Sequence, residues 1–339
     1  RILIGTISPG TYTGKAYSYD FSFNTTTWNL TTTANTFATN NASGQFGFSI
    51  AMNAAGTRTI IGEPGYQTGH VYSYDVSAVT GYWGLTTTGS TINSDQDLSY
   101  NPVIVDASFG YAVTMDDAGT WCAVGAPTAG SSRGWVGIYK SMGHGYQWAR
   151  YMDISGQNVG DQFGSAVQMN GVGDRLMIGA KGYNSNAGTN YIYNYNATHL
   201  VWELERDISS ATIGASGKQG TALATNTLGN RFVSGAPEAY SSDGAIVVYD
   251  RQMKCNALFK DNNTWIAGGN KNQELFFSND GIDWKKNDLT SIQYLYDNSY
   301  YSNLTLYGSN YKITGSTTNF GHSVALNASG TIMAVGVSA

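Results

Sequence analysis

The sequence is poor in charged residues, proline and cysteine, and it lacks long apolar runs. Charged residues make up 12% of its 339 positions, and the formal net charge is -5. The 18 Lys and Arg residues are scattered along the chain, so we expect no basic surface for nucleic acid. No apolar run approaches the roughly 20 residues that a membrane-spanning helix needs, so we expect no membrane insertion.

Cysteine is represented only by Cys122 and Cys255, and this excludes a disulfide framework. Cys122 lies in the apolar run "TWCAVGA", where we expect a buried small hydrophobic side chain. Nucleophile elbows, zinc-binding helices and phosphate-binding loops are missing too. The segment "GQNVGDQFG" places Asp161 beside glycines, but without the helix that phosphate binding requires. We therefore expect no cofactor, no metal and no enzymatic activity.

What the sequence does contain is one phrase repeated five times. Each copy has "FG" or a variant of it, then an Asx-x-x-Gly segment, then an apolar run that ends near glycine. The steps between the first positions of the copies are 63, 54, 56 and 101 residues. A period of this size predicts a repeat architecture. The copies lie at residues 45–65, 108–128, 162–182, 218–238 and 319–339.

Each regular period divides into four predicted strands. In the first, Phe46, Phe48 and Ile50 alternate with smaller residues, so we expect a strand that begins at "FG" with its large side chains on one face. The Asx-x-x-Gly segments predict tight hairpins between the first and second strands. The third strand follows a glycine, as in "GHVYSYD", and the fourth begins near a tryptophan, as in "TWNLTTT".

Four-stranded antiparallel units that repeat in this way predict an all-β fold, a β-propeller of seven blades or, alternatively, six. An open solenoid is the other arrangement, but a propeller leaves fewer exposed sheet edges. We expect one propeller over residues 1–339, with regular blades in 1–250 and 319–339 and shorter, atypical blade units in 251–318. The opening "RILIGTISPG" is typical of a second strand, which predicts that the chain is a fragment of a longer polypeptide.

The pair "FG" and "GAP", as in Phe109-Gly110 and Gly125-Ala126-Pro127, resembles the FG-GAP repeat of integrin-α-type propellers. The resemblance covers most of residues 1–250 and 319–339. It implies a role in adhesion or in other recognition of proteins and glycans. Calcium-binding members of that family carry an Asp-x-Asp-x-Asp-Gly loop where this sequence has its tight hairpins. Because Ca²⁺ needs six to eight oxygen ligands, we expect no calcium there.

Residues 251–318 interrupt the repeat with two shorter phrases, 256–288 and 291–316. The segment "SNDGIDW" within the first resembles the Asp-box turn of sialidase-like propellers. Arrays that mix both kinds of unit resemble surface proteins of large DNA viruses and secreted microbial adhesins. A sialidase would also need an arginine cluster at the axis. Arg58, Arg175 and Arg231 occupy one repeat position, however, so we expect them to be solvated and far apart.

The loops that join second to third strands, and fourth to first strands, should share one face of a propeller. Tyrosine and small polar residues recur there, and these residue types favour recognition because they combine contact area with adaptable hydrogen bonds. The alternative is that each tyrosine only packs beneath its own loop. The candidate binding residues are Tyr12, Tyr66, Tyr183, Tyr240, Tyr100 and Arg133.

The function predicted from these features is a non-enzymatic interaction or adhesion module on a cell or virion exterior, with a protein or glycan partner. Two alternatives stay open, a structural scaffold that contacts other capsid proteins and a sialidase-like glycan-active enzyme. Sequons permit glycosylation without arguing for it, since a chain this rich in Asn, Ser and Thr contains several by chance. They are headed by Asn24, Asn29, Asn41, Asn196, Asn262, Asn303 and Asn327.

Overall fold

The computed structural model divides the chain into two units, Arg1–Val248 with Tyr311–Ala339, and Tyr249–Asn310. Beyond residue 250 it describes the strands alone. The described residues are 1–7, 14–22, 24, 26–30, 36–39, 41, 43–78, 83–85, 91–93, 107–142, 148–208, 216–250, 254–261, 264–269, 275–278, 285–286, 304–305, 311–314, 320–326 and 333–337.

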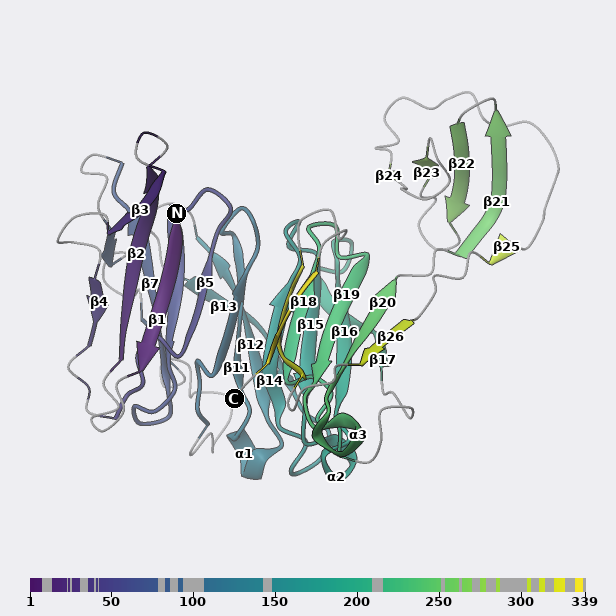
Figure 1. Ribbon diagram of the computed structural model, residues 1–339. Coiled ribbons are helices and arrows are strands. Elements are labelled where there is room, and N and C mark those ends of the chain that lie inside the picture. The colour runs from purple at the N-terminus through teal and green to yellow at the C-terminus, as the bar shows by residue number, and fades with distance from the viewer. Residues whose placement is uncertain are drawn as a thin grey trace. The chain divides into compact units, whose positions relative to one another are not determined.

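The described residues of the first unit form six antiparallel sheets. The first five of them run in chain order from the purple to the green strands of Figure 1. Sheet I is formed by β1 (Ile2–Ile7), β2 (Gly14–Ser22), β3 (Thr27–Leu30) and β4 (Thr36–Ala38). Sheet II is formed by β5 (Ser49–Met52), β6 (Arg58–Glu63), β7 (His70–Val76), β8 (Trp83–Leu85) and β9 (Thr91–Asn93). Sheet III is formed by β10 (Ala112–Met115), β11 (Trp121–Ala126), β12 (Trp135–Ser141) and β13 (Trp148–Ser155).

Sheets IV and V have four strands each, and sheet VI has two. Sheet IV is formed by β14 (Phe163–Met169), β15 (Arg175–Ala180), β16 (Thr189–Asn196) and β17 (Val201–Ile208). Sheet V is formed by β18 (Ala222–Thr225), β19 (Arg231–Ala236), β20 (Ala245–Asp250) and β26 (Tyr311–Thr314). Sheet VI is formed by β27 (Phe320–Leu326) and β28 (Met333–Val337).

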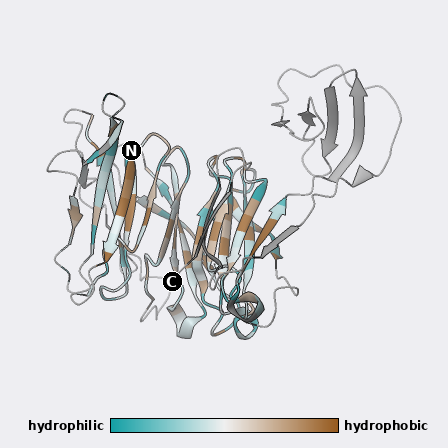
Figure 2. Ribbon diagram, viewed as in Figure 1, coloured by the Kyte–Doolittle hydropathy of each residue, from teal (hydrophilic) through white to brown (hydrophobic). Residues whose placement is uncertain are grey.

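The predicted four-stranded antiparallel unit is confirmed in sheets III and IV, where the strands pair in chain order. The second strands β6, β11 and β15 are buried along their whole length, which explains their continuous apolar runs. Figure 2 shows hydrophobic stretches, in brown, along several strands of this unit. The first strands β5, β10, β14, β18 and β27 contact one another in succession. This arrangement is compatible with a propeller-like fold.

Repeated glycines let adjacent sheets approach each other. A Cβ on Gly125, the glycine of "GAP", would lie 2.2 Å from the carbonyl oxygen of Gly164, the glycine of the next "FG". Gly5 with Gly47, Gly62 with Gly110, and Gly179 with Gly220 make the same contact. The two halves of the repeated phrase are therefore partners across a sheet boundary.

The prediction that "FG" begins the first strand holds in sheets IV and VI, where β14 and β27 begin at Phe163 and Phe320 with a register shift just after them. It is wrong in sheets II, III and V, where the strands begin after "FG" or its variant. Gly47 has a left-handed φ of 86°, and β5 begins only at Ser49. Phe46 is fully buried, whereas Phe48 is 37% exposed, so the two side chains do not share a face. The left-handed glycine breaks the alternation because it reverses the direction of the chain before the strand starts.

The Asx-x-x-Gly hairpins are confirmed as structural turns. Oδ1 of Asn53 accepts hydrogen bonds from the backbone N–H groups of Thr57 and Arg58, at 2.9 and 3.0 Å. Asp116, Asn170 and Asn226 make the equivalent pair of bonds in their own sheets. The side chain thereby caps the turn and is fully used by it.

The prediction that the repeat arginines are solvated is wrong, because Arg58 and Arg175 are 7% and 4% exposed. Arg58 binds both carboxylate oxygens of Asp75, at 2.6 and 2.9 Å, and reaches the carbonyl oxygen of Gly119 in sheet III at 2.8 Å. Arg1 binds the Gly56 carbonyl and Arg175 the Gly229 carbonyl, at 2.8 and 2.7 Å. Each arginine thus ties its own sheet to the hairpin of the next.

Tryptophans that begin the fourth strands also contact these arginines. We call an arginine with its contacts to the next sheet an arginine clamp. Arg1 lies over the ring of Trp83, and Arg58 over that of Trp148, at 5.2 and 5.5 Å from the centroids. Sheet III has Trp121 at the arginine position, and this ring contacts Trp202 of sheet IV at 5.8 Å. The arginines and tryptophans that recur in the sequence therefore contact each other between one sheet and the next.

Residues 311–314, which the sequence placed in the second short unit, pair with β20 and complete sheet V. The second unit is a five-stranded sheet in the order β24-β23-β22-β21-β25. The segment "SNDGIDW" lies outside the described residues except for Ser278. The strands are β21 (Lys254–Asp261), β22 (Thr264–Gly269), β23 (Leu275–Ser278), β24 (Lys285–Lys286) and β25 (Leu304–Thr305).

Cys122 is fully buried, as predicted, and burial raises the pKa of its thiol well above the ordinary value. The thiol therefore stays protonated and acts as a small apolar side chain. Among the described residues, no helix is long and apolar enough to cross a membrane.

Candidate functional site

The two ends of the sheets carry different connections. We call the end with the Asx-x-x-Gly turns the hairpin end, and the opposite end, where second strands lead to third strands, the loop end. Three short turns lie at the loop end, α1 (Ala129–Ser132), α2 (Tyr183–Asn186) and α3 (Ala239–Ser242). Figure 1 shows them close together at the same end of sheets III to V. The predicted binding face is this loop end.

The turns α1 and α2 have an unusual backbone. Gly130 and Ser131 have φ values of 58° and 58°, and Asn184 and Ser185 have 48° and 57°. Consecutive left-handed residues are rare for L-amino acids, and each costs about 1–2 kcal/mol. Glycine and asparagine bear that cost most easily, which explains the residue types. The two turns therefore share one backbone geometry.

Of the predicted binding residues, Tyr66, Tyr183 and Tyr240 are half-buried, and Arg133 is exposed. Tyr12 and Tyr100 lie outside the described residues. The Tyr66 ring packs edge-on against His70, with centroids 5.0 Å apart.

The tyrosines at the loop end do not share one repeat position. The backbone N–H of Gly188 binds the carbonyl of Tyr183, whereas that of Gly244 binds the carbonyl of Ala239. Tyr183 therefore corresponds to Ala239, and Tyr240 occupies the next position along the turn. The sequence already contains this one-residue offset, because Tyr183 lies four positions after Gly179 and Tyr240 five positions after Gly235.

One exposed aromatic group lies where the first strands begin. The Phe48 and Tyr111 rings, from neighbouring sheets, have centroids 4.8 Å apart. The Lys181 ammonium lies 5.2 Å from the centroid of Tyr111 and 3.2 Å from its hydroxyl. We call these three side chains the aromatic platform. A half-exposed pair of rings beside a fixed cation offers both apolar contact and charge.

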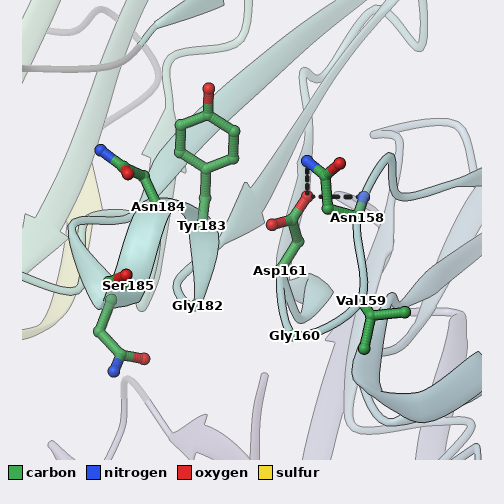
Figure 3. Close-up of a pocket in the computed structure, with 9 residues that line it drawn as sticks. Asn158, Val159, Gly160, Asp161, Gly182, Tyr183, Asn184 and Ser185 are labelled. Atoms are coloured by element: carbon green, nitrogen blue, oxygen red, sulfur yellow. Dashed lines mark hydrogen bonds between the residues drawn. The ribbon is translucent and has the colours of Figure 1, made fainter.

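An open hollow of about 540 Å³ lies in sheet IV at the loop end, directly after Lys181 in the chain. Two segments line it, residues 158–161 and 182–186 (Figure 3). The backbone N–H of Gly182 joins them by donating to the carbonyl of Asp161, at 3.0 Å. The volume is within the range of small-molecule sites, about 300–1,000 Å³. We call this hollow the sheet IV pocket.

Asp161 is the charged residue of the pocket lining and is only 4% exposed. Its Oδ2 accepts hydrogen bonds from the backbone N–H and the side-chain amide of Asn158, at 3.0 and 3.2 Å. The other carboxylate oxygen points toward Tyr183 (Figure 3). Burial, and secondarily the Asp161 carboxylate, raises the pKa of Tyr191 to about 12, so this phenol stays neutral beneath the site.

A second buried carboxylate, Glu63, has a structural role. It is fully buried and accepts hydrogen bonds from the side chains of Thr39, Asn41 and Tyr72. Burial, together with the hydrogen bond to Glu63, raises the pKa of Tyr72. These donors satisfy the carboxylate and join the connection after sheet I to sheet II.

Four sequon asparagines fall in the described part of the chain. Asn24 and Asn29 are exposed. The Asn41 amide nitrogen donates to Glu63 at 2.8 Å, and the Asn196 amide nitrogen donates to Glu203 at 3.1 Å. The other three, Asn262, Asn303 and Asn327, lie outside the described residues.

Within the described residues, no group of three or more His, Cys, Asp or Glu side chains is placed to hold a metal ion. The sequence singled out Asp161 only as a rejected phosphate ligand, and it missed the pocket. The signal was an acidic residue two positions before Phe163, where the other copies have Gly44, Ala107 and Gly217. The aromatic platform was hidden by the incorrect alternation across "FG".

No protein-family model matches the chain, and no curated protein matches it. Among solved structures, a functionally unknown protein from Desulfotomaculum acetoxidans DSM 771 is similar, with a TM-score of 0.43 and 13% sequence identity. The similarity covers 70% of this chain and 61% of that one, so the chain spans about three fifths of that protein's length. A likeness of this degree carries no argument, and the site is interpreted from its own residues.

Proposed function

We propose that the chain is a non-enzymatic interaction or adhesion module whose loop end binds a protein or glycan partner. Its sheets are the blades of an FG-GAP-like propeller, seven in number or alternatively six, and it works on a cell or virion exterior. The observation that carries the proposal is the aromatic platform of Phe48, Tyr111 and Lys181, exposed at the same end as the sheet IV pocket.

The hairpin end supports the proposal by contrast. Its Asx side chains and repeat arginines are taken up by bonds within and between sheets. At the loop end, Phe48 remains 37% exposed beside Tyr111. Exposed aromatic side chains next to adaptable polar loops are typical of recognition surfaces.

An array experiment tests this function. The labelled protein is applied to neutral, sulfated and sialylated glycans printed beside extracellular-matrix proteins. We expect binding to at least one class, and its loss in the double variant Phe48→Ala/Tyr111→Ala.

The matched control is Val172→Ala/Leu228→Ala, which removes exposed apolar side chains at the hairpin end, where both residues are 56% exposed. This variant should bind like the parent protein. Absence of binding to every array class, or equal loss in both double variants, contradicts the proposal.

A further inference from the structure

The sheet IV pocket differs from the aromatic platform in its chemistry. Its lining combines the Asp161 carboxylate, the side chains of Asn158 and Asn184, the Ser185 hydroxyl and the Tyr183 ring. These groups donate and accept hydrogen bonds in nearly equal measure, and no lysine or arginine is among the lining residues. The pocket therefore suits a ligand that both donates and accepts.

The charge of the lining restricts the ligand further. A carboxylate without a cation beside it repels anions, so phosphates, sulfates and sialic acids fit poorly. A calcium ion would need six to eight oxygen ligands, while the pocket offers one carboxylate. A purely apolar ligand would leave the buried Asp161 unsatisfied. An organic cation would use the carboxylate but not the amide and hydroxyl donors of the lining, whereas an uncharged molecule rich in hydroxyl groups would use both.

The geometry around Asp161 favours such a ligand. Asn158 holds one carboxylate oxygen through two hydrogen bonds, and this fixes the other oxygen toward the hollow and the Tyr183 ring (Figure 3). A fixed acceptor beside an aromatic ring matches a sugar, whose hydroxyls donate and whose C–H face is apolar. Asn184 and Ser185 form the opposite wall of the pocket, and their left-handed backbone is part of the turn α2 itself.

We propose that the sheet IV pocket binds a neutral sugar residue of a glycan, with Asp161 as the acceptor for a sugar hydroxyl. This inference rests on the proposed function and deepens it, because it assigns a ligand class to one place at the loop end. The binding is non-covalent, and the pocket holds the sugar without chemical change.

Saturation-transfer difference NMR with lactose, maltose, cellobiose and chitobiose tests the assignment, with 3′-sialyllactose and CaCl₂ as competing probes. We expect saturation transfer to at least one neutral disaccharide. The variant Asp161→Asn can still accept from Asn158 while replacing the free acceptor by a donor. It should therefore lower affinity about tenfold or more.

Asp174→Asn is the matched control, since it removes the same charge at the hairpin end of the same sheet and should leave sugar binding unchanged. Val159→Trp is the second variant. Val159 lines the pocket and is 63% exposed, so a bulky ring there should block the hollow without unfolding the protein. Circular dichroism checks that each variant is folded.

Several outcomes would overturn the inference. They are saturation transfer from none of the neutral sugars, preference for sialyllactose, binding of Ca²⁺ alone, or equal binding by Val159→Trp and the parent. If array binding depends on Phe48 and Tyr111 but not on Asp161, the pocket assignment fails and the proposed function stands. If it depends on Asp161 alone, the role of the platform in the proposed function fails.

Discussion

The hairpin end and the loop end of the same sheets differ in how far their side-chain contacts repeat from one sheet to the next. At the hairpin end, the Asx oxygen makes the same two bonds in four sheets, and three arginines make the same bond to the next sheet. At the loop end, the glycine contacts and backbone hydrogen bonds beneath the surface recur, while the side chains above them differ from sheet to sheet. Repetition marks what holds the sheets together, and variation marks the end at which we propose that a partner is recognised.

Asp161 illustrates this difference. The equivalent positions in sheets II, III and V hold Gly44, Ala107 and Gly217. The bond beneath it, from the Gly182 N–H to the Asp161 carbonyl, recurs in sheet II from Gly65 to Gly44, at 3.0 and 2.9 Å. The scaffold is thus repeated, and the carboxylate is an addition that the scaffold does not need.

The largest effect is expected from Gly164→Leu, beneath the loop end. Gly164 has a φ of 86°, and a Cβ there would lie 2.7 Å from the Trp135 carbonyl oxygen. Strain and overpacking together should cost about 3 kcal/mol or more of the free energy of unfolding. Thermal unfolding followed by circular dichroism measures this. A variant that melts like the parent would show that the glycine contacts do not hold the sheets together.

Arg58→Ala should have the next largest effect and tests the hairpin end. It leaves the Asp75 carboxylate and the Gly119 carbonyl without their shared donor in a buried place. Breaking a buried pair by removing one partner costs about 3 kcal/mol. The control is Lys218→Ala, whose pair with Glu238 is more exposed and should cost well under 1 kcal/mol. If urea titrations show the same loss of stability in both variants, the buried contacts of Arg58 stabilise the protein no more than an exposed ion pair does.

The outcome for Arg58 also shows what a sequence pattern can reveal. The strands and Asx turns were predictable because local periodicity and turn chemistry determine them. The clamp was not, because its partners Asp75, Gly119 and Trp148 lie in other strands and in the next sheet. The available signal was a repeat position that holds arginine or tryptophan in one copy, together with a tryptophan near the start of the fourth strand in the following copy.

The candidate site was harder to predict for a related reason. The exposure of Phe48 follows from the left-handed Gly47, and the turn that lines the pocket has a left-handed backbone at Asn184 and Ser185. Positive φ values outside glycine are uncommon and carry no reliable sequence signature. The pocket needed two loops that only the fold brings together, around Asp161 and Gly182.

A smaller effect is expected from Asp116→Asn, which makes the sheet III turn like its neighbours. Burial raises the pKa of Asp116 above the ordinary value of an aspartate, despite three opposing backbone hydrogen bonds. The folded state therefore holds this proton more tightly than the unfolded state, and stability falls as pH rises through the raised pKa. The variant should remove that fall and be more stable than the parent at neutral pH.

Urea titrations from acid to neutral pH measure the slope for the parent and the variant. Asp117→Asn is the control, since its side chain is exposed beside the same turn. If Asp116→Asn and the parent lose stability in parallel as pH rises, the burial of this carboxylate is not the cause.

The smallest effect on stability is expected at the surface of the loop end, where Arg133→Ala and Val159→Ala should each change the free energy of unfolding by less than about 0.5 kcal/mol. Arg133 is exposed and Val159 is 63% exposed, so truncating either leaves no cavity and no buried partner unsatisfied. The comparison with Arg58→Ala is direct, because both arginines lie at sheet boundaries and differ in which end they occupy. Thermal melts of the three variants measured side by side give the test. If Arg133→Ala lowers stability as much as Arg58→Ala does, the loop end also carries a clamp, and its variation from sheet to sheet would then reflect packing and not recognition.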